Sequence, residues 1–163
     1  MSTPRAVIAA RSLQDAPQER RDARMGKAWV DVLHGVPLFQ PLSKRHVRKI
    51  AEAGTEARFE PGTPIVRKGE RGETFFVILD GEARVHMGGK RRARLGMGDF
   101  FGEMALLDGG ARSATVTAET QVHAMRISRR RFLQVVERDP KLALELLKVL
   151  AARLRASERS TSL

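Results

Sequence analysis

The 163-residue sequence contains no cysteine, no tyrosine and a single tryptophan. Without cysteine, the chain can form neither a disulfide framework nor a metal site built on thiolates. A clear nucleic-acid-binding signal would pair basic residues with aromatic side chains that stack on bases, but aromatic residues make up only 5% of this chain. The composition therefore disfavours nucleic acid as a partner.

Long hydrophobic runs are also absent from the amino-terminal region. Its one apolar run, residues 7–10, is much shorter than a signal-peptide core or a membrane span. Acidic residues at positions 15, 19 and 22 argue against a mitochondrial transit peptide. We therefore expect a soluble, cytoplasmic protein with no membrane span.

The net charge of +11 is concentrated at the two ends of the chain. Residues 1–30 carry six basic and three acidic side chains, and residues 128–163 carry nine basic and four acidic ones. Two interpretations stay open: an acidic partner bound by the ends, or an arginine-rich surface that is simply solvated.

Residues 1–27 are polar and basic and are interrupted by two prolines, which predicts a flexible arm. Between residues 28 and 54, apolar positions recur at helical spacing and Pro37 separates two short helices. Ser43 is a good amino-terminal cap for the second helix, and Gly54 ends it.

Residues 55–127 switch to the pattern of short strands separated by turns that contain Gly, Pro or Asp. The expected strands are 57–59, 65–67, 75–79, 83–87, 91–95, 113–117 and 122–127. Turn signals at intervals of about 8–12 residues are typical of an antiparallel sandwich or barrel. Gly88-Gly89 is a good signal for a two-residue hairpin turn.

Helical periodicity returns after Ser128, a second good cap, and continues to residue 157 with an interruption at Asp139-Pro140. The polar residues 158–163 are expected to form a frayed tail. The predicted fold class is therefore α+β: a jelly-roll-like antiparallel β-roll of about eight strands, flanked by amino-terminal helices and two carboxy-terminal helices.

The most informative segment is residues 101–116, Phe-Gly-Glu-Met-Ala-Leu-Leu-Asp-Gly-Gly-Ala-Arg-Ser-Ala-Thr-Val. Arg112 offers several donors to phosphate oxygens, and the first amides of a helix favour an anion. Glu103 can only accept hydrogen bonds, so it should face a donor such as a sugar hydroxyl. The segment suits a small ligand with a phosphate at one end and a sugar hydroxyl at the other.

This segment resembles the phosphate-binding cassette of cyclic-nucleotide-binding domains at every position. The resemblance extends over about residues 30–157, through the helical lead-in 36–42, the turn Pro61-Gly62, the segment 69–81 and the approach 98–103. It implies that residues 28–157 form one such domain, with helices at 28–54, the β-roll at 55–127 and helices with a lid at 128–157.

The resemblance also implies roles for individual residues. Arg112 would bind the cyclic phosphate, Glu103 would bind the ribose 2′-hydroxyl and orient Arg112, and Met104, Leu106 and Leu107 would anchor the cassette in the core. The full set of implied ligand contacts is Gly102, Glu103, Met104, Ala105, Arg112, Ser113, Ala114, Val85 and Leu95, with Leu150, Arg153 and Leu154 on the lid.

Ser113 is similar to the serine of bacterial cyclic-AMP-responsive activators, so the resemblance favours cyclic AMP over cyclic GMP. The expected function is a cyclic-nucleotide sensor with no other cofactor, whose carboxy-terminal helices signal to a separate protein partner. An alternative is a degenerate β-roll in which Glu103 and Arg112 form a structural clamp and the basic surface serves as a scaffold.

The sequence contains no recognisable catalytic set. Its four histidines also lack metal-ligand spacing, which disfavours a small β-roll metalloenzyme. We therefore expect that the protein is not an enzyme.

Overall fold

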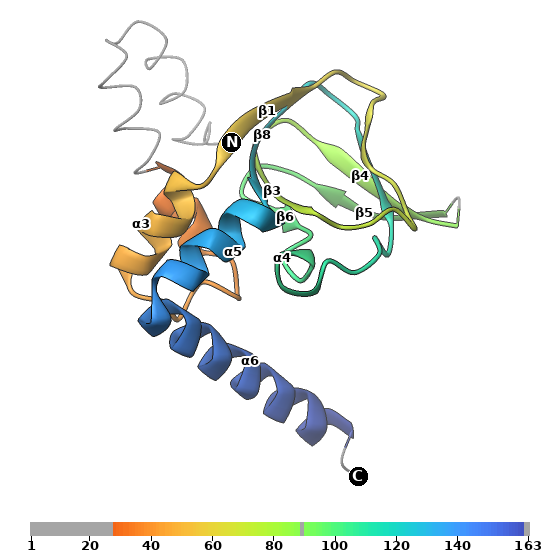
Figure 1. Cartoon of the computed structure of the whole chain (residues 1–163). Coiled ribbons are helices and arrows are strands. Elements are labelled where there is room, and N and C mark those ends of the chain that lie inside the picture. Colours follow the sequence, from red (N-terminus) through yellow and green to blue (C-terminus); the bar gives the residue numbers. More distant parts are fainter. Residues whose placement is uncertain (1–27, 89, 162–163) are drawn as a thin grey trace, which may run out of the picture.

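The computed structural model describes residues 28–88 and 90–161. In this part of the chain, eight strands form two four-stranded antiparallel sheets that make up a β-roll (Figure 1). One sheet has the order β1-β8-β3-β6 and the other β2-β7-β4-β5. The strands are β1 Thr55–Phe59, β2 Pro64–Val66, β3 Thr74–Asp80, β4 Ala83–Met87, β5 Lys90–Leu95, β6 Phe100–Phe101, β7 Thr115–Ala118 and β8 Val122–Ser128. The predicted fold class is confirmed.

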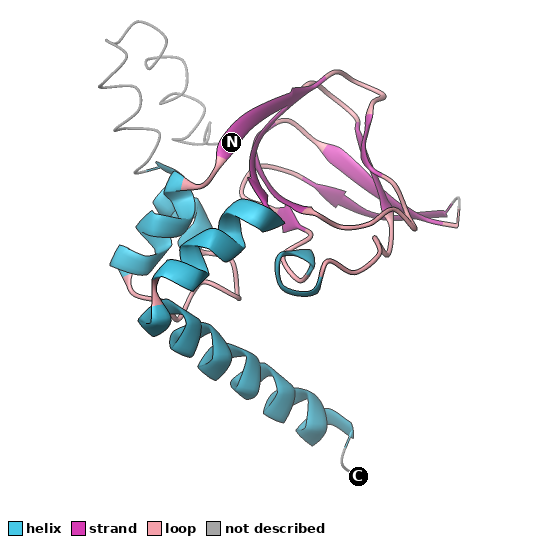
Figure 2. Cartoon of the chain, in the orientation of Figure 1, coloured by secondary structure: helices cyan, strands magenta, loops and turns pink. Residues whose placement is uncertain are grey.

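Helices gather on one side of the roll (Figure 2). A helix that includes residues 28–34 precedes α3 (Lys44–Glu52), and α4 (Ala105–Asp108) lies within the cassette. After the last strand come α5 (Arg129–Arg138) and α6 (Pro140–Thr161), whose far half extends away from the roll in Figure 1.

Both predicted amino-terminal caps are confirmed. The Ser43 hydroxyl accepts a hydrogen bond from the His46 amide at 3.3 Å, and the Ser128 hydroxyl accepts one from the Arg131 amide at 3.3 Å. The predicted break between the two last helices is also present. There Asp139 caps α6 by accepting from the Leu142 amide at 3.2 Å, ahead of a proline at the first helical position.

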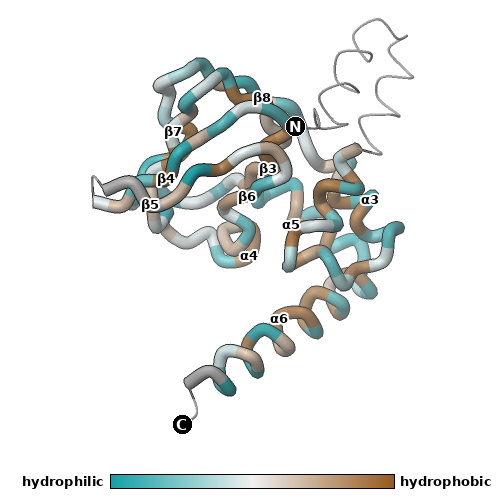
Figure 3. Tube along the Cα trace, turned by 180° about the vertical axis from the view of Figure 1, so that it is seen from behind, coloured by the Kyte–Doolittle hydropathy of each residue, from teal (hydrophilic) through white to brown (hydrophobic). Residues whose placement is uncertain are grey.

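Two apolar clusters meet at β3 and β8, because side chains alternate between the two faces of a strand. Phe75 and Val77 of β3 pack into a cluster with the helices, whereas Phe76 and Ile78 pack inside the roll. Strand β8 divides in the same way. The uninterrupted apolar run of β3 therefore reflects a strand that is covered on both faces. Figure 3 shows hydrophobic segments of α3, α5 and the start of α6 facing one another.

The seven strands expected from the sequence agree with the structure to within two residues at each end. The eighth, β6, pairs only Phe100 and Phe101 with β3, and such a short strand has no periodicity to detect. Helix α6 continues through residues 158–161, where the sequence predicts a frayed tail. The predicted arm 1–27, the second residue of the Gly88-Gly89 turn and residues 162–163 lie outside the described residues.

Candidate functional site

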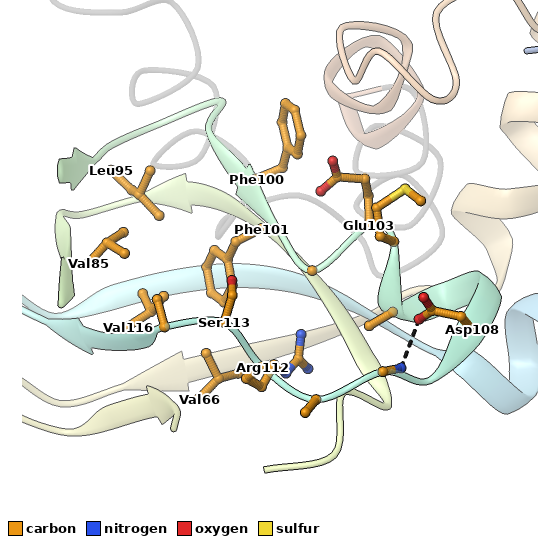
Figure 4. A pocket seen from close by; sticks show the side chains of 16 residues that line it. Val66, Val85, Leu95, Phe100, Phe101, Glu103, Asp108, Arg112, Ser113 and Val116 are labelled. Atoms are coloured by element: carbon orange, nitrogen blue, oxygen red, sulfur yellow. Dashed lines mark hydrogen bonds between the residues drawn. The ribbon is translucent and has the colours of Figure 1, made fainter. Parts of the chain in front are cut away.

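A cavity of about 420 Å³ lies between the cassette and the interior of the β-roll (Figure 4). This volume falls within the range of small-molecule binding sites, about 300–1,000 Å³. Nine of the residues expected to contact a ligand line it: Val85, Leu95, Gly102, Glu103, Met104, Ala105, Arg112, Ser113 and Ala114. The fold thus brings together residues from β4, β5 and the cassette.

Arg112 supplies the positive charge of the cavity. Its Nη2 donates to the carbonyl oxygen of Thr74 at 2.5 Å, which holds the guanidinium in one orientation. Its Nη1 is buried and has no hydrogen-bond partner among the described residues. Burial lowers the pKa of Arg112, and the negative charge of Glu70 partly offsets that effect. Because arginine stays protonated in proteins, the site holds a half-buried cation with a buried donor that is unused within the described residues.

Gly102 allows the guanidinium to sit close to the backbone. Its φ of +84° is in the left-handed region, and a Cβ at this position would overlap Nη1 of Arg112. A glycine is therefore required here both by the backbone conformation and by the arginine.

The backbone of Arg112 is bonded to the turn before β3. The Arg112 amide donates to the Glu70 carbonyl at 2.8 Å, and the Gly69 amide donates to the Arg112 carbonyl at 2.9 Å. A further bond joins the Gly72 amide to the Gly110 carbonyl at 2.9 Å. These bonds fix the arginine relative to the roll.

Glu103 lies on the far side of the cavity from Val85 and Val116, as Figure 4 shows. Within the described residues it forms no ion pair with Arg112, so the carbonyl of Thr74, rather than Glu103, orients the guanidinium. Its carboxylate is left facing the cavity.

The cassette helix is anchored differently from the prediction. Leu106 is fully buried and Leu107 packs partly against the helical cluster, but Met104 is 45% exposed. The prediction that Met104 is a core anchor is wrong, because its side chain is largely exposed, although the residue lines the cavity.

The first amides of α4 are not free donors. The amides of Ala105 and Leu106 donate to the carbonyls of Gly102 and Glu103 at 3.1 and 3.2 Å. Asp108 accepts a hydrogen bond from the Gly110 amide at 2.8 Å, at the end of the helix (Figure 4). Arg112, rather than these amides, is therefore the main hydrogen-bond donor that the site offers to an anion.

The opposite end of the cavity is apolar, and sequence reasoning missed part of it. Val66, Phe101 and Val116 line it together with Val85 and Leu95. Val85 and Val116 face each other in the β4–β7 ladder. The alternation within β7 marks Val116 as an inward residue, but only the strand pairing reveals that it shares a wall with Val85.

The three residues expected on the lid do not line this cavity. Leu150, Arg153 and Leu154 lie on α6, and the Leu154 side chain is 61% exposed. Figure 1 shows that this part of α6 is directed away from the roll. Contact between these residues and a ligand in the cavity requires α6 to move.

Residues 28–88 and 90–161 contain neither a metal-ligand cluster nor a membrane-spanning helix. No group of three or more histidine or acidic side chains there is arranged to hold a metal ion. None of the helices in this part has an apolar stretch long enough to cross a membrane.

The fold and the cavity together define a β-roll domain that can receive a small anionic ligand. A sequence model described as "Cyclic nucleotide-binding domain" matches residues 56–139, just over half of the chain. The protein belongs to the cyclic nucleotide-binding domain family.

Individual relatives agree with this assignment. The chain is 34% identical over 131 residues to the cyclic AMP receptor protein of Thermus thermophilus, an alignment that covers 77% of this chain and 61% of the relative. It is also 34% identical over 112 residues to the cAMP-dependent protein kinase regulatory subunit of Colletotrichum orbiculare, covering 68% of this chain and 29% of the relative. The chain thus spans less than two thirds of either relative.

A solved structure with a similar fold is the amino-terminal domain of a transcriptional regulator from Streptomyces coelicolor A3(2). It superposes with a TM-score of 0.74 at 25% sequence identity, covering 82% of this chain and 96% of that domain.

Proposed function

We propose that this protein is a receptor for a purine 3′,5′-cyclic monophosphate, with a preference for cyclic AMP. The observation that carries the proposal is Arg112, which lines a cavity of about 420 Å³ and whose buried Nη1 has no partner in the part of the chain that the structure describes. A buried charged donor without a partner is unfavourable, so an anion that fits the cavity gains a strong charge-assisted hydrogen bond.

The remaining parts of a cyclic nucleotide match the rest of the cavity. The Glu103 carboxylate accepts a hydrogen bond from the ribose 2′-hydroxyl, and the Ser113 hydroxyl assists Arg112 at the phosphate. The base lies against the apolar end formed by Val66, Val85 and Val116. The cavity thus offers a cation for the phosphate, a carboxylate for the ribose hydroxyl and an apolar wall for the base.

Ligand binding reaches the helices through Arg129, the first residue of α5. Its Nη2 donates to the Leu107 carbonyl of the cassette helix at 3.2 Å, and its amide donates to the Glu73 carbonyl at 2.8 Å. A change in the cassette therefore acts directly on α5. We infer that α6 then swings so that Leu150, Arg153 and Leu154 cover the base, and that a separate protein partner senses this movement.

Isothermal titration calorimetry with cyclic AMP, cyclic GMP and 5′-AMP tests this function. We expect cyclic AMP to bind most tightly. Arg112→Ala removes the phosphate donor and should weaken cyclic AMP binding by about 2–5 kcal/mol, a loss of about 30-fold or more in affinity. The matched control is Arg58→Ala, which removes an exposed arginine of β1 outside the cavity and should leave the affinity unchanged.

Two outcomes would contradict the proposal. Equal affinities for the wild type and Arg112→Ala would remove the assigned role of Arg112. No binding of any nucleotide, together with salt-sensitive binding to a polyanion, would instead favour the basic scaffold. Titrations with the nucleotides and with a polyanion thus distinguish a nucleotide receptor from a basic scaffold.

A further inference from the structure

A cluster of four charged or titratable side chains joins α3 to the start of α6, away from the cavity. We call it the α3–α6 polar cluster; it consists of His46, Lys49, Asp139 and Glu145. His46 Nδ1 lies 2.6 Å from Glu145 Oε2, and His46 Nε2 lies 3.3 Å from Asp139 Oδ2. The cluster therefore holds α6 at its cap, Asp139, and again at Glu145, more than one turn further along.

The contacts of His46 depend on its protonation state. Each ring nitrogen faces a carboxylate oxygen, and a carboxylate only accepts hydrogen bonds. A neutral imidazole has one N–H, so it can satisfy one of these carboxylates and must present a lone pair to the other. Both contacts are strongest when the ring carries two protons, because it is then a cation between two carboxylates. Of the two, only the Nδ1–Glu145 contact has the geometry of a hydrogen bond.

Burial increases the energetic difference between the singly and the doubly protonated ring. His46 is only 6% exposed, so little water is available to replace a lost hydrogen bond. By contrast, Lys49 donates to Asp139 Oδ2 at 2.5 Å and keeps its charge when His46 loses a proton. Loss of the His46 proton therefore weakens the hold on α6 without releasing the Asp139 cap.

The charged groups that face His46 in the described residues come from both neighbouring elements. Asp139 lies at the α5–α6 junction and Glu145 lies on α6, while Lys49 of α3 acts through Asp139. The two carboxylates contact opposite nitrogens of the ring. They therefore do not converge on one point, as a metal site would require.

We propose that His46 is a proton-dependent latch that holds the start of α6 against α3 and so regulates the movement of α6. In the doubly protonated form His46 hydrogen-bonds to Glu145, forms an ion pair with Asp139 and retains α6 in the position seen here. After loss of one proton the ring is neutral, both contacts weaken and α6 is freer to move.

The consequence for ligand affinity rests on the proposed function. If a cyclic nucleotide draws α6 away from α3, binding breaks contacts that favour the protonated ring. Ligand binding then releases a proton, and by linkage the affinity for the ligand rises with pH. The latch is thus a positioning device for α6 that acts without touching the nucleotide.

The first experiment needs no ligand. Hydrogen exchange of the α6 amides in residues 140–147 is followed across about pH 5 to 8, the range in which histidines ordinarily change charge, after correction for intrinsic exchange rates. We expect protection to fall by about ten-fold or more as the pH rises, because a buried cation that faces two carboxylates loses its charge. In His46→Gln and in Glu145→Gln, protection should vary little with pH.

His123→Gln is the matched control. His123 lies on β8, where its Nε2 is 3.4 Å from Glu56 of β1. It is outside the α3–α6 polar cluster, so its replacement should leave the pH response of α6 intact. A wild-type response that persists unchanged in His46→Gln would overturn the latch.

The second experiment measures proton release directly. Cyclic AMP is titrated calorimetrically at one pH in two buffers of different ionisation enthalpy, with the wild type, His46→Gln and His123→Gln. We expect proton release from the wild type and from His123→Gln, and none from His46→Gln. Equal proton release from all three proteins would contradict the inference. If cyclic AMP does not bind at all, the proposed function fails, and the exchange experiment still decides whether the latch exists.

Discussion

Gly102 and Arg112 depend on each other at the residue scale. The backbone of Gly102 is left-handed, and the absence of a side chain leaves the space that the Arg112 guanidinium occupies. The arginine lines the cavity and is held on one side by the Thr74 carbonyl, while its buried Nη1 lies beside Gly102. Orientation of the donor before the ligand arrives lowers the entropic cost of binding.

Gly102→Ala should therefore weaken nucleotide binding, in addition to the loss of stability that the left-handed backbone causes. The matched control is Gly62→Ala, where φ is +85° and a Cβ would meet no atom within 4 Å. Both variants should lose about 1–2 kcal/mol of unfolding free energy from the left-handed backbone. Only Gly102→Ala should weaken cyclic AMP binding, measured by calorimetry. Equal affinities in the two variants would show that the glycine does not serve the arginine.

Glu103 can be tested through the hydroxyl that it is proposed to bind. The wild type should bind cyclic AMP more tightly than 2′-deoxy cyclic AMP by about ten-fold or more, because a hydrogen bond to a charged group contributes about 1.5–3 kcal/mol. Glu103→Gln should bind both ligands with similar, weaker affinity. A variant that discriminates as well as the wild type would assign the 2′-hydroxyl to another residue.

At the scale of elements, the junction between α5 and α6 depends on Asp139. Its Oδ1 accepts from the Leu142 amide and its Oδ2 accepts from Lys49 of α3. The hydrogen bond from Lys49 is the largest cause of a pKa for Asp139 of about 2, below the ordinary 3.8. One carboxylate thus caps a helix and joins it to another.

This pKa predicts a defined loss of stability in acid. Because the carboxylate is favoured in the folded state, its contribution to the free energy of unfolding is complete above about pH 4 and is lost as the pH falls from about 4 to 2. Asp139→Asn retains a capping side chain but not the charge. Urea denaturation at several pH values should show the wild type more stable at neutral pH, with the difference shrinking below pH 4. Parallel stability curves would contradict this assignment.

At the scale of the whole molecule, two apolar clusters share β3 and β8, and the helices are attached to the roll through one of them. Phe132 of α5 is completely buried, and the centroid of its ring lies 6.1 Å from that of Phe39. The helical layer that is proposed to transmit the signal therefore belongs to the core of the protein.

Phe132→Ala should lower the free energy of unfolding by about 3–5 kcal/mol, because it removes a large buried side chain and leaves a cavity. The matched control is Leu147→Ala on the exposed face of α6, where Leu147 is 62% exposed and the change should be within about 0.5 kcal/mol. Urea denaturation monitored by circular dichroism measures both. Similar losses in the two variants would mean that α5 is not packed as the structure describes.

Much of this architecture was predictable because it depends on neighbours along the chain. The caps at Ser43 and Ser128, the break at Asp139-Pro140 and the strand limits follow from short-range sterics and from the period of apolar residues. The cassette was recognisable for the same reason, since its residues are consecutive. Nine of the expected ligand contacts accordingly meet in one cavity.

The remaining features depend on which distant segments lie side by side. Thr74 and Arg112 are 38 residues apart, and His46 and Glu145 are 99 apart. No local pattern encodes such pairs, because strand register and helix docking are decided by the packing of the whole core. The same reason explains why Met104 is exposed rather than buried in the core and why the far half of α6 lies apart from the roll.

The sequence by itself determined the kinds of elements, their order and the chemical groups of the cassette, since these depend on interactions between residues a few positions apart. The tertiary structure alone decided which carbonyl orients Arg112, which valines complete the apolar end and which carboxylates contact His46. These are contacts between surfaces that meet only when the two sheets and the helical layer pack together.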